Sequence, residues 1–428
     1  MAGCTGGDDD DSNGNGNGNG NGNGNGNGNG NGNENGNGEV VNGGESGTLR
    51  LGAPMGLSGP YAAEAEDKQQ TLRLIQEDVN NGPLSEEYNW EIEVVEEDTE
   101  LDPAKAVEVS RRMIEEEDVD AFTGGPSSSS SGLAMAPLVF EFQVPWFSLQ
   151  GTNLLHREAC NRYAFQMAAP ASMSARGVFP LMDQQDFGDR VFTLAADYSW
   201  GHDLSADIKQ FTEESGREFL GEVRTPFGAS DMTDFLASAQ NENPDVLFLI
   251  HYGTDNATAI EQAVSMGLHE EMEIVSPLAL ITATRAVSPE SLQHIYAANN
   301  WYHGHDNERS QSFAEDFNDR VGRYPSDLAQ TAYKNTFLYL DTVQELGTKN
   351  SEEIINEIEG KSYKYMKGQE HVRAEDHLNE QGYFLLEGKA PEDREYEEDH
   401  FEVIELLSRN EVTPDPTGGC DLDTVEDV

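Results

Sequence analysis

Five consecutive serines occupy residues 127–131, directly after the apolar, β-prone segment 119–123 and the strand-breaking Gly-Gly-Pro at 124–126. The apolar positions that follow Gly132 indicate a packed helix. A strand that turns through glycine into a serine-capped helix presents free backbone N–H groups and hydroxyls at the helix N-terminus. The stretch therefore predicts a cradle for a carboxylate or another small polar group. A capped helix without a ligand would have the same pattern, so both interpretations stay open here.

Strands and helices alternate on both sides of the serine stretch. Strands are expected at 49–53, 90–95 and 144–148, and helices at 62–79 and 102–116. This alternation predicts an α/β fold with a mostly parallel sheet and helices on both faces. Because ligands bind at the carboxyl ends of such strands, the loops 54–61, 124–131 and 149–153 belong on one edge of the sheet.

A second unit repeats this alternation of strands and helices from about residue 172. Its expected strands are 190–195, 218–224, 245–250 and 272–276, followed by helices at 311–321, 326–346 and 351–358 and by late strands at 382–386 and 401–406. We interpret the chain as two lobes with more than one crossover between them. Two such lobes leave a cleft that can close around a ligand.

The charge of the chain is strongly negative. Asp and Glu number 80 against 26 Lys and Arg, which gives a formal net charge of −54. This balance argues against nucleic acid or an anionic membrane surface as an electrostatic partner. Self-repulsion on this scale destabilises a compact protein unless salt screens it, and at ~1 M salt the screening length is about 3 Å. We therefore expect a halophilic, archaeal source.

The N-terminal segment is of low complexity. Met1-Ala2-Gly3-Cys4 resembles the cleavage end of a lipoprotein signal, in which small residues precede a lipid-bearing cysteine. Asn-Gly repeats dominate the region that follows, and they offer almost no apolar surface to bury. We expect residues 1–47 to form a disordered tether from a lipid anchor at Cys4. The alternative is an ordinary start with a chance cysteine and a dispensable tail.

Five segments, taken in order, resemble a known family. They are LRLGAPMGLSGPYA, FTGGPSSSSSGLAMAP, VPWFSLQGTN, FTLAADYSWGHDL and DVLFLIHYG. The set is similar to the leucine/isoleucine/valine-type (branched-chain amino acid or amide) substrate-binding proteins of ABC importers, which have the type I periplasmic-binding fold. The resemblance spans about residues 48–420. It implies an extracytoplasmic, cell-surface receptor that captures a small solute and delivers it to permease subunits.

The resemblance also implies lobe boundaries and ligand-binding positions. We expect lobe 1 to comprise 48–168 and 302–365, and lobe 2 to comprise 169–301 and 366–428. The ligand-binding positions that the family motifs assign, loop by loop, are Ser58 and Tyr61, then Ser128 and Ser129, then Gln150, Gly151 and Thr152, then Trp200, and finally Tyr252 and Asp255.

One departure from the family pattern concerns the ligand. Amino-acid binders of this family often carry a glutamate for the α-ammonium in the loop after the strand at 272–276. Here that loop, residues 277–280, reads Pro-Leu-Ala-Leu and has no carboxylate. Either Asp255 supplies the missing charge, or the ligand is an amide, a urea-like compound or an aromatic acid.

The remaining motifs are weaker. Outside the cytoplasm, Cys160 and Cys420 are expected to pair. The His-Gly-His-Asp run at 303–306 lacks a third well-placed ligand, so we expect no metal and no cofactor. Neither a Gly-x-Ser-x-Gly elbow nor a phosphate-binding Gly-x-x-x-x-Gly-Lys loop occurs. The rival interpretations are a ligand-sensing receptor of a signalling system and, as the weaker rival, an amidase-like enzyme.

Overall fold

The computed structural model describes residues 46–416 and 418–424. Cys4 and all but the last two residues of the expected tether lie outside these ranges. None of the helices in the described ranges combines the length and the apolar character that a membrane crossing requires.

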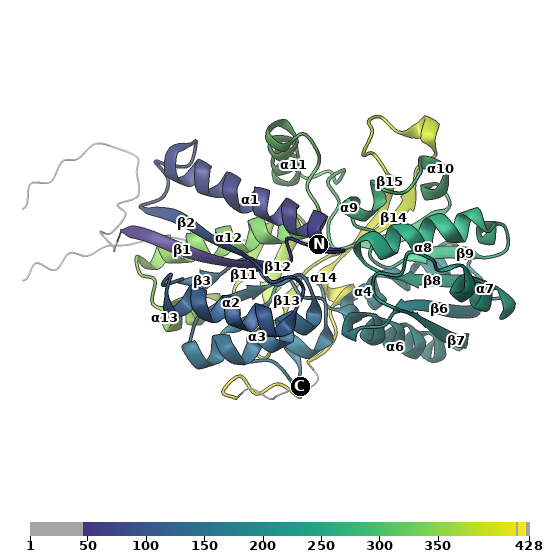
Figure 1. Ribbon diagram of the computed structural model, residues 1–428, viewed down its shortest axis with the longest axis horizontal. Coiled ribbons are helices and arrows are strands. Elements are labelled where there is room, and N and C mark those ends of the chain that lie inside the picture. Colours follow the sequence, from purple (N-terminus) through teal and green to yellow (C-terminus); the bar gives the residue numbers. More distant parts are fainter. Residues whose placement is uncertain (1–45, 417, 425–428) are drawn as a thin grey trace, which may run out of the picture. The chain divides into compact units, whose positions relative to one another are not determined.

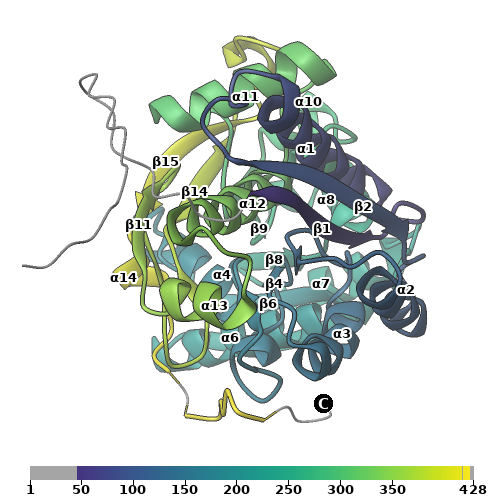
Figure 2. The same ribbon diagram turned by 90° about the vertical axis from the view of Figure 1, so that its left-hand side faces the viewer.

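The first lobe is built on a five-stranded parallel sheet in the order β2-β1-β3-β4-β5. Its strands are β1 (Gly47–Met55), β2 (Trp90–Asp98), β3 (Ala121–Phe122), β4 (Trp146–Ser148) and β5 (Ala164–Gln166). Its helices are α1 (Ala62–Asn81), α2 (Pro103–Glu115), α3 (Ser129–Phe142), the 3-10 turn η1 (Asn153–His156) and the later α11 (Glu308–Val321), α12 (Asp327–Leu346) and α13 (Ser351–Ile358). Helix α1 lies on one face of the sheet, and α2 and α3 lie on the other (Figures 1 and 2).

The second lobe is built on a seven-stranded sheet in the order β15-β14-β10-β9-β8-β6-β7. Its strands are β6 (Arg190–Ala196), β7 (Glu218–Thr225), β8 (Val246–Ile250), β9 (Glu273–Ser276), β10 (Ile295–Asn299), β14 (Tyr383–Gly388) and β15 (Phe401–Leu407). Its helices are α4 (Ala171–Val178), α5 (Leu181–Gln184), α6 (Ser199–Glu214), α7 (Thr233–Asn241), α8 (Gly253–Ser265), η2 (Leu268–Glu270), α9 (Ile281–Thr284), α10 (Pro289–Leu292), η3 (Pro391–Asp393) and α14 (Arg409–Val412). Strand β14 pairs in antiparallel fashion with both β10 and β15; the other pairs are parallel.

Continuous apolar runs explain why these strands are central. All five residues of β8, Val-Leu-Phe-Leu-Ile, are buried. A parallel strand whose two faces are both covered by helices needs apolar side chains at every position rather than at alternate ones. The mostly parallel, two-lobed α/β architecture expected from the sequence is confirmed.

A small third sheet shifts the expected lobe boundary. Its strands β11 (Ser362–Tyr365), β12 (Gly368–Val372) and β13 (Asn379–Glu380) pair in antiparallel fashion. Leu378 forms a parallel bridge with Gln166 at the end of β5, and the His377 ring stacks on Phe165 at 4.1 Å. Residues 366–380 therefore lie with the first lobe, not with the second as expected. The β11–β12 hairpin turns the chain back before it crosses, so the crossover comes just before β14.

Contacts between the lobes flank the space between them. Glu64 on α1 accepts a 2.8 Å hydrogen bond from the hydroxyl of Thr282 on α9, and its other oxygen has no partner among the described residues. On another side, Asn153 donates a 2.8 Å hydrogen bond to Asp207 on α6. Glu64 is 1 % exposed, and burial raises its pKa to about 7.

The C-terminal segment returns to the first lobe. A disulfide joins Cys160 to Cys420, with 5.6 Å between the two Cα atoms. Nearby, the backbone N–H of Arg162 donates to the carbonyl of Leu422 at 2.9 Å. The expected pairing of the two cysteines is present, and it ties the end of the chain to the segment that follows η1.

We expect the disulfide to hold this segment in place. Replacing both Cys160 and Cys420 by serine removes a constraint on the unfolded chain, so the free energy of unfolding falls by about 2–5 kcal/mol. The C-terminal residues then become accessible to protease, which mass spectrometry of limited digests detects. As a control, unreduced protein denatured in guanidinium exposes no thiol other than that of Cys4. Two further reactive thiols in that sample would contradict the assignment.

The buried carboxyl of Glu64 gives a second prediction. Because its folded-state pKa lies above the unfolded value near 4.5, folding becomes less favourable as pH rises from about 4.5 to about 7. Glutamine does not ionise. The unfolding free energy of Glu64→Gln relative to wild type therefore rises by up to about 3 kcal/mol between pH 4.5 and 8, as urea titrations measure. Glu66→Gln, on the exposed face of α1, is the control. A Glu64→Gln difference that is independent of pH would contradict the prediction.

Candidate ligand-binding site

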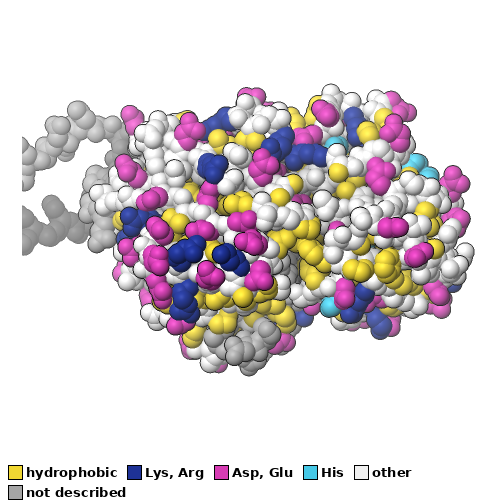
Figure 3. Space-filling model, in the orientation of Figure 1, with side chains coloured by type: hydrophobic (Ala, Val, Ile, Leu, Met, Phe, Trp, Pro, Cys, Tyr) yellow, Lys and Arg dark blue, Asp and Glu magenta, His cyan; other side chains and the backbone are white. Residues whose placement is uncertain are grey.

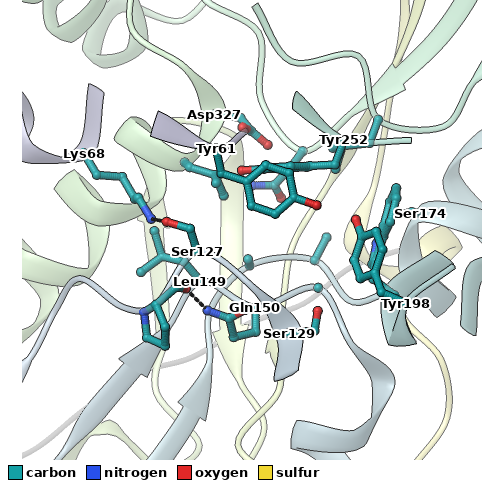
Figure 4. A pocket seen from close by; sticks show the side chains of 18 of the residues that line it. Tyr61, Lys68, Ser127, Ser129, Leu149, Gln150, Ser174, Tyr198, Tyr252 and Asp327 are labelled. Atoms are coloured by element: carbon teal, nitrogen blue, oxygen red, sulfur yellow. Dashed lines mark hydrogen bonds between the residues drawn. The ribbon is translucent and has the colours of Figure 1, made fainter. Parts of the chain in front are cut away.

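One cavity is lined by side chains from both lobes. Its empty volume is about 610 Å³, the open space at its mouth included. Lys68 and Ser127 lie on one side of the cavity in Figure 4, Ser174 and Tyr198 lie on the opposite side, and Tyr61 and Tyr252 lie between them.

The ten residues assigned from the family motifs divide into two groups. The structure places six of them in the cavity lining: Tyr61, Ser129, Gln150, Gly151, Trp200 and Tyr252. The other four, Ser58, Ser128, Thr152 and Asp255, lie outside the lining. In each of these four cases, the local backbone or a specific hydrogen bond accounts for the difference.

Ser58 is exposed because its loop turns sharply at Gly59, which has a φ of 81°. This left-handed conformation suits glycine and reverses the chain before α1. The backbone N–H of Ala62 then bonds to the Gly59 carbonyl at 3.2 Å. Tyr61, at the start of α1, is buried and lines the cavity, whereas Ser58 remains on the solvent side.

The serine stretch forms the start of α3, and each serine has a different role. Ser128 is the N-cap, and its hydroxyl accepts the Ser131 backbone N–H at 3.3 Å. Ser129, the first helical residue, is 5 % exposed and lines the cavity. Ser127 also lines it, and its hydroxyl contacts the Lys68 ammonium at 3.1 Å. Ser127 and Ser129 therefore line the cavity, while Ser128 stabilises the helix end.

The segment after β4 supplies an amide and a close backbone contact. The side-chain amide of Gln150 donates to the Pro126 carbonyl, which fixes Gln150 beside the serine stretch. A Cβ atom at Gly151 would lie 2.8 Å from Cδ1 of Trp200, so only glycine lets this indole of the second lobe approach. Thr152 instead donates a 2.9 Å hydrogen bond to Asp203 on α6. It therefore links the lobes outside the cavity.

Aromatic side chains cover the second-lobe side. Tyr198 and Trp200 follow β6, and Tyr252 follows β8, at the carboxyl ends of parallel strands. The Tyr61 and Tyr252 rings meet edge to face with their centroids 4.5 Å apart, and the Phe227 ring packs against Tyr61 at 5.2 Å. The hydroxyl of Tyr252 is buried and has no hydrogen-bond partner among the described residues. Burial raises the pKa of Tyr252 well above 10, so this hydroxyl stays protonated and can donate.

Asp255 is positioned by a loop of its own lobe. One of its carboxylate oxygens accepts the backbone N–H of Gly228 at 2.8 Å. This bond fixes the loop between β7 and α7, and Asp255 does not line the cavity. In the loop after β9, Leu278 is the residue that reaches the lining. The suggestion that Asp255 replaces the missing glutamate is therefore not supported by its position.

Lys68 is a lining residue that the sequence analysis missed. It lies on α1 and is completely buried, with its ammonium 3.4 Å from the Gly125 carbonyl and 3.1 Å from the Ser127 hydroxyl. Burial lowers its pKa to about 8. A signal for it existed in the sequence, because Lys68 lies at helical spacing between the apolar Ala65 and Leu72 on the buried face.

Asp327 was also missed. It is the first residue of α12, after the N-cap Ser326, and it is 3 % exposed in the cavity lining. Burial raises its pKa to about 7. An acidic residue at this position is ordinary for a helix start, so the sequence offered no signal that distinguishes it. The other lining residues absent from the motif assignment are Pro126, Leu149, Ala168, Ala169, Ser174, Tyr198, Leu278, Asn300, Leu328 and Tyr383.

The histidines of the 303–306 run lie elsewhere. His303 is buried and stacks on Tyr324 at 4.4 Å. Within residues 46–416 and 418–424, no group of three or more His, Cys, Asp or Glu side chains is arranged to hold a metal ion.

Several known proteins are similar to this chain in sequence. The relatives include "Leu/Ile/Val-binding protein homolog 4" of Brucella abortus and of Brucella suis, each 25 % identical over 228 residues, which is 51 % of this chain and 53 % of the relative. The match thus spans about half the length of these curated relatives.

Solved structures share the fold over most of the chain. An amino acid ABC transporter substrate-binding protein from Pseudomonas fluorescens Pf-5 aligns with a TM-score of 0.80 and 24 % identity, covering 88 % of this chain and 100 % of that one. A solute-binding protein from Rhodopseudomonas palustris in complex with benzoate gives 0.76 and 19 %, covering 87 % and 99 %. The leucine-, isoleucine-, valine-, threonine- and alanine-binding protein of Brucella ovis, in a closed conformation, gives 0.75 and 20 %, covering 87 % and 98 %.

These likenesses confirm the type I periplasmic-binding fold. Residues 48–394 match the family model described as "Periplasmic binding protein". The two lobes, the cavity between them and this match lead to one conclusion: the chain belongs to the periplasmic binding protein family.

Proposed function

We propose that this protein is the extracytoplasmic solute receptor of an ABC importer. It captures a small amino acid, an amide or a related organic acid between its lobes and delivers it to the permease subunits. The observation that carries the proposal is the cavity itself, because both lobes contribute its lining. A ligand that contacts both lobes stabilises the closed arrangement over an open one, which is the requirement for ligand-driven closure.

The lining divides by chemistry. The hydroxyl of Ser129, the amide of Gln150 and the ammonium of Lys68 lie on the first-lobe side and suit a carboxylate or a carbonyl. Trp200, with the tyrosines around it, suits an apolar or aromatic group. The relatives' names mention branched-chain amino acids, and the structural neighbours include a complex with benzoate. Both classes share a carboxylate joined to an apolar part.

The site of action follows from the same proposal. We propose a cell-surface location with attachment through a lipid on Cys4, in a halophilic archaeon. The family and the resemblance of Met1-Ala2-Gly3-Cys4 to a lipoprotein cleavage site support the location. The net charge of −54 supports the halophilic source, and Figure 3 shows Asp and Glu side chains over the visible face of the body.

Two rival functions can be distinguished from a transport receptor by experiment. A ligand-sensing receptor would use the same cavity, and neighbouring genes for permease and ATPase subunits separate it from a transport receptor. An amidase would need a nucleophile beside a positioned base. Among the described residues, the cavity lining includes no histidine, but the Lys68 nitrogen lies 3.1 Å from the Ser127 hydroxyl, so an assay of amide hydrolysis distinguishes an amidase from a receptor.

Ligand binding can be tested by thermal shift in high salt. A ligand present at 100 times its dissociation constant should add about 2.7 kcal/mol to the stability of the wild type. Ser129→Ala and Trp200→Ala should each weaken binding by tenfold or more, because they remove a buried hydrogen-bonding group and a large apolar contact. Ser130→Ala, one residue along on the exposed side of α3, is the matched control. Equal ligand shifts for all four proteins would contradict the proposed site.

Salt dependence tests the halophilic part of the proposal. The melting temperature should rise as KCl increases from about 0.1 M to about 1 M and change less above it, because the screening length has by then fallen to about 3 Å. Surface ion pairs weaken over the same range, but each contributes little. Sucrose at matched osmolality is the control for water activity. A melting temperature that stays flat below 1 M KCl would contradict repulsion as the governing effect.

A further inference from the structure

Two buried groups of opposite charge line the cavity without pairing with each other. Lys68 comes from α1, and Asp327 comes from the start of α12. Within the described part of the chain, no carboxylate oxygen lies within 4.0 Å of the Lys68 ammonium, and no basic nitrogen lies within 4.0 Å of the Asp327 carboxylate. Each is therefore a buried ionisable group without an ion-pair partner in this part of the chain.

Asp327 is the more exceptional of the two. Its Oδ1 atom is buried and has no hydrogen-bond partner among residues 46–416 and 418–424. Removing a carboxylate oxygen from water without a hydrogen-bond partner is unfavourable, and backbone N–H groups of Asp327 and Leu328, which lower the pKa of this carboxyl, offset only part of that cost. The unfavourable burial is visible in the raised pKa of about 7. Position at a helix start offsets only part of this cost.

Among the described residues, the charged neighbours of Asp327 do not form an ion pair with its carboxylate. Lys367 lowers the Asp327 pKa electrostatically, but its ammonium donates to the Asn300 carbonyl at 2.9 Å, to the Asn300 side chain at 3.0 Å and to Gln381 at 2.5 Å. These three bonds use all three of its donors. Glu64 is the other charged neighbour, and as a like charge it raises the pKa of Asp327.

The other carboxylates considered for this role are occupied or absent. Asp255 bonds to the Gly228 backbone and lies outside the lining. The loop after β9, residues 277–280, contains no acidic residue. Among the described residues that line the cavity, only Asp327 has a carboxylate.

We propose that Asp327 is the counter-charge for a positively charged nitrogen of the ligand. The inference rests on the proposed solute-binding function and deepens it. The ligand carries an ammonium group that contacts Asp327 and an anionic or carbonyl group that contacts Lys68 and Ser129. In this chain the cation-binding residue thus comes from α12 of the first lobe and not from the loop after β9. A carboxylic acid without an ammonium group leaves Asp327 unpaired and binds more weakly.

Matched ligand pairs test this assignment. The pairs are leucine with 4-methylpentanoate, glutamine with 4-carbamoylbutanoate and phenylalanine with 3-phenylpropanoate, and the members of each pair differ only in the ammonium group. For wild type in high salt, we expect calorimetry to give at least tenfold tighter binding of an amino acid than of its partner. Asp327→Asn should reduce this ratio to near one, and Asp255→Asn should keep it.

A second measurement works on the wild type alone, so it does not depend on how the variant folds. At pH 7 the carboxyl of Asp327 is about half protonated, and an ammonium ligand ionises it, so binding releases up to about half a proton. Titrations in phosphate and in Tris, which differ in ionisation enthalpy, measure this release. The deaminated partner of each pair should release none and serves as the subtraction control.

The outcomes separate the inference from the function on which it rests. If wild type binds both members of a pair equally, or if Asp327→Asn keeps the tenfold ratio, the assignment of Asp327 is wrong while the receptor function stands. If an amino acid releases no more protons on binding to wild type than the deaminated compound of its pair does, the assignment is also wrong. If neither these compounds nor amides, urea or aromatic acids shift the melting of wild type, the proposed function itself fails.

Discussion

Each helix that follows a parallel strand begins at the carboxyl edge of the sheet, and this constraint places most of the cavity lining. In the first lobe, Ser129 follows β3 and Gln150 follows β4. In the second lobe, Trp200 follows β6 and Tyr252 follows β8. Because these edges of both sheets line one cavity, residues far apart in the sequence meet around it. The contact between Gly151 and Trp200 shows how closely the two lobes approach there.

Buried charges separate structural side chains from candidate binding side chains. Lys334 and Glu370 are both fully buried, but they pair at 2.9 Å, and Lys334 also donates to Gln381 at 3.1 Å. A buried pair that is hydrogen-bonded in this way offsets its own desolvation, and it joins α12 to the third sheet. Within residues 46–416 and 418–424, Lys68 and Asp327 have no such partners. Both line the same cavity, so a ligand with an anionic and a cationic group can complement them.

Sequence alone gave much of this picture, and the parts it missed have physical causes. Alternating strands and helices predicted the sheets, and the ordered motifs placed Ser129, Gln150 and Trp200 in the lining. Ser128 shows the limit of that reasoning, because adjacent serines look alike in sequence until the helix start decides which one caps. Asp327 shows another limit, because an acidic first residue is common in helices and its burial depends on distant elements. The lobe boundary moved because the β11–β12 hairpin turned the chain back before it crossed.

The central claim is that a small solute is held between the lobes in this cavity, and a crystal structure of the protein with bound ligand tests it most directly. We expect ligand density between the first-lobe side, at Lys68 and Ser129, and Trp200 of the second lobe, with a polar atom of the ligand within hydrogen-bond distance of Ser129. Density for a tightly bound ligand at any other place on the protein, with this cavity empty, would contradict the account.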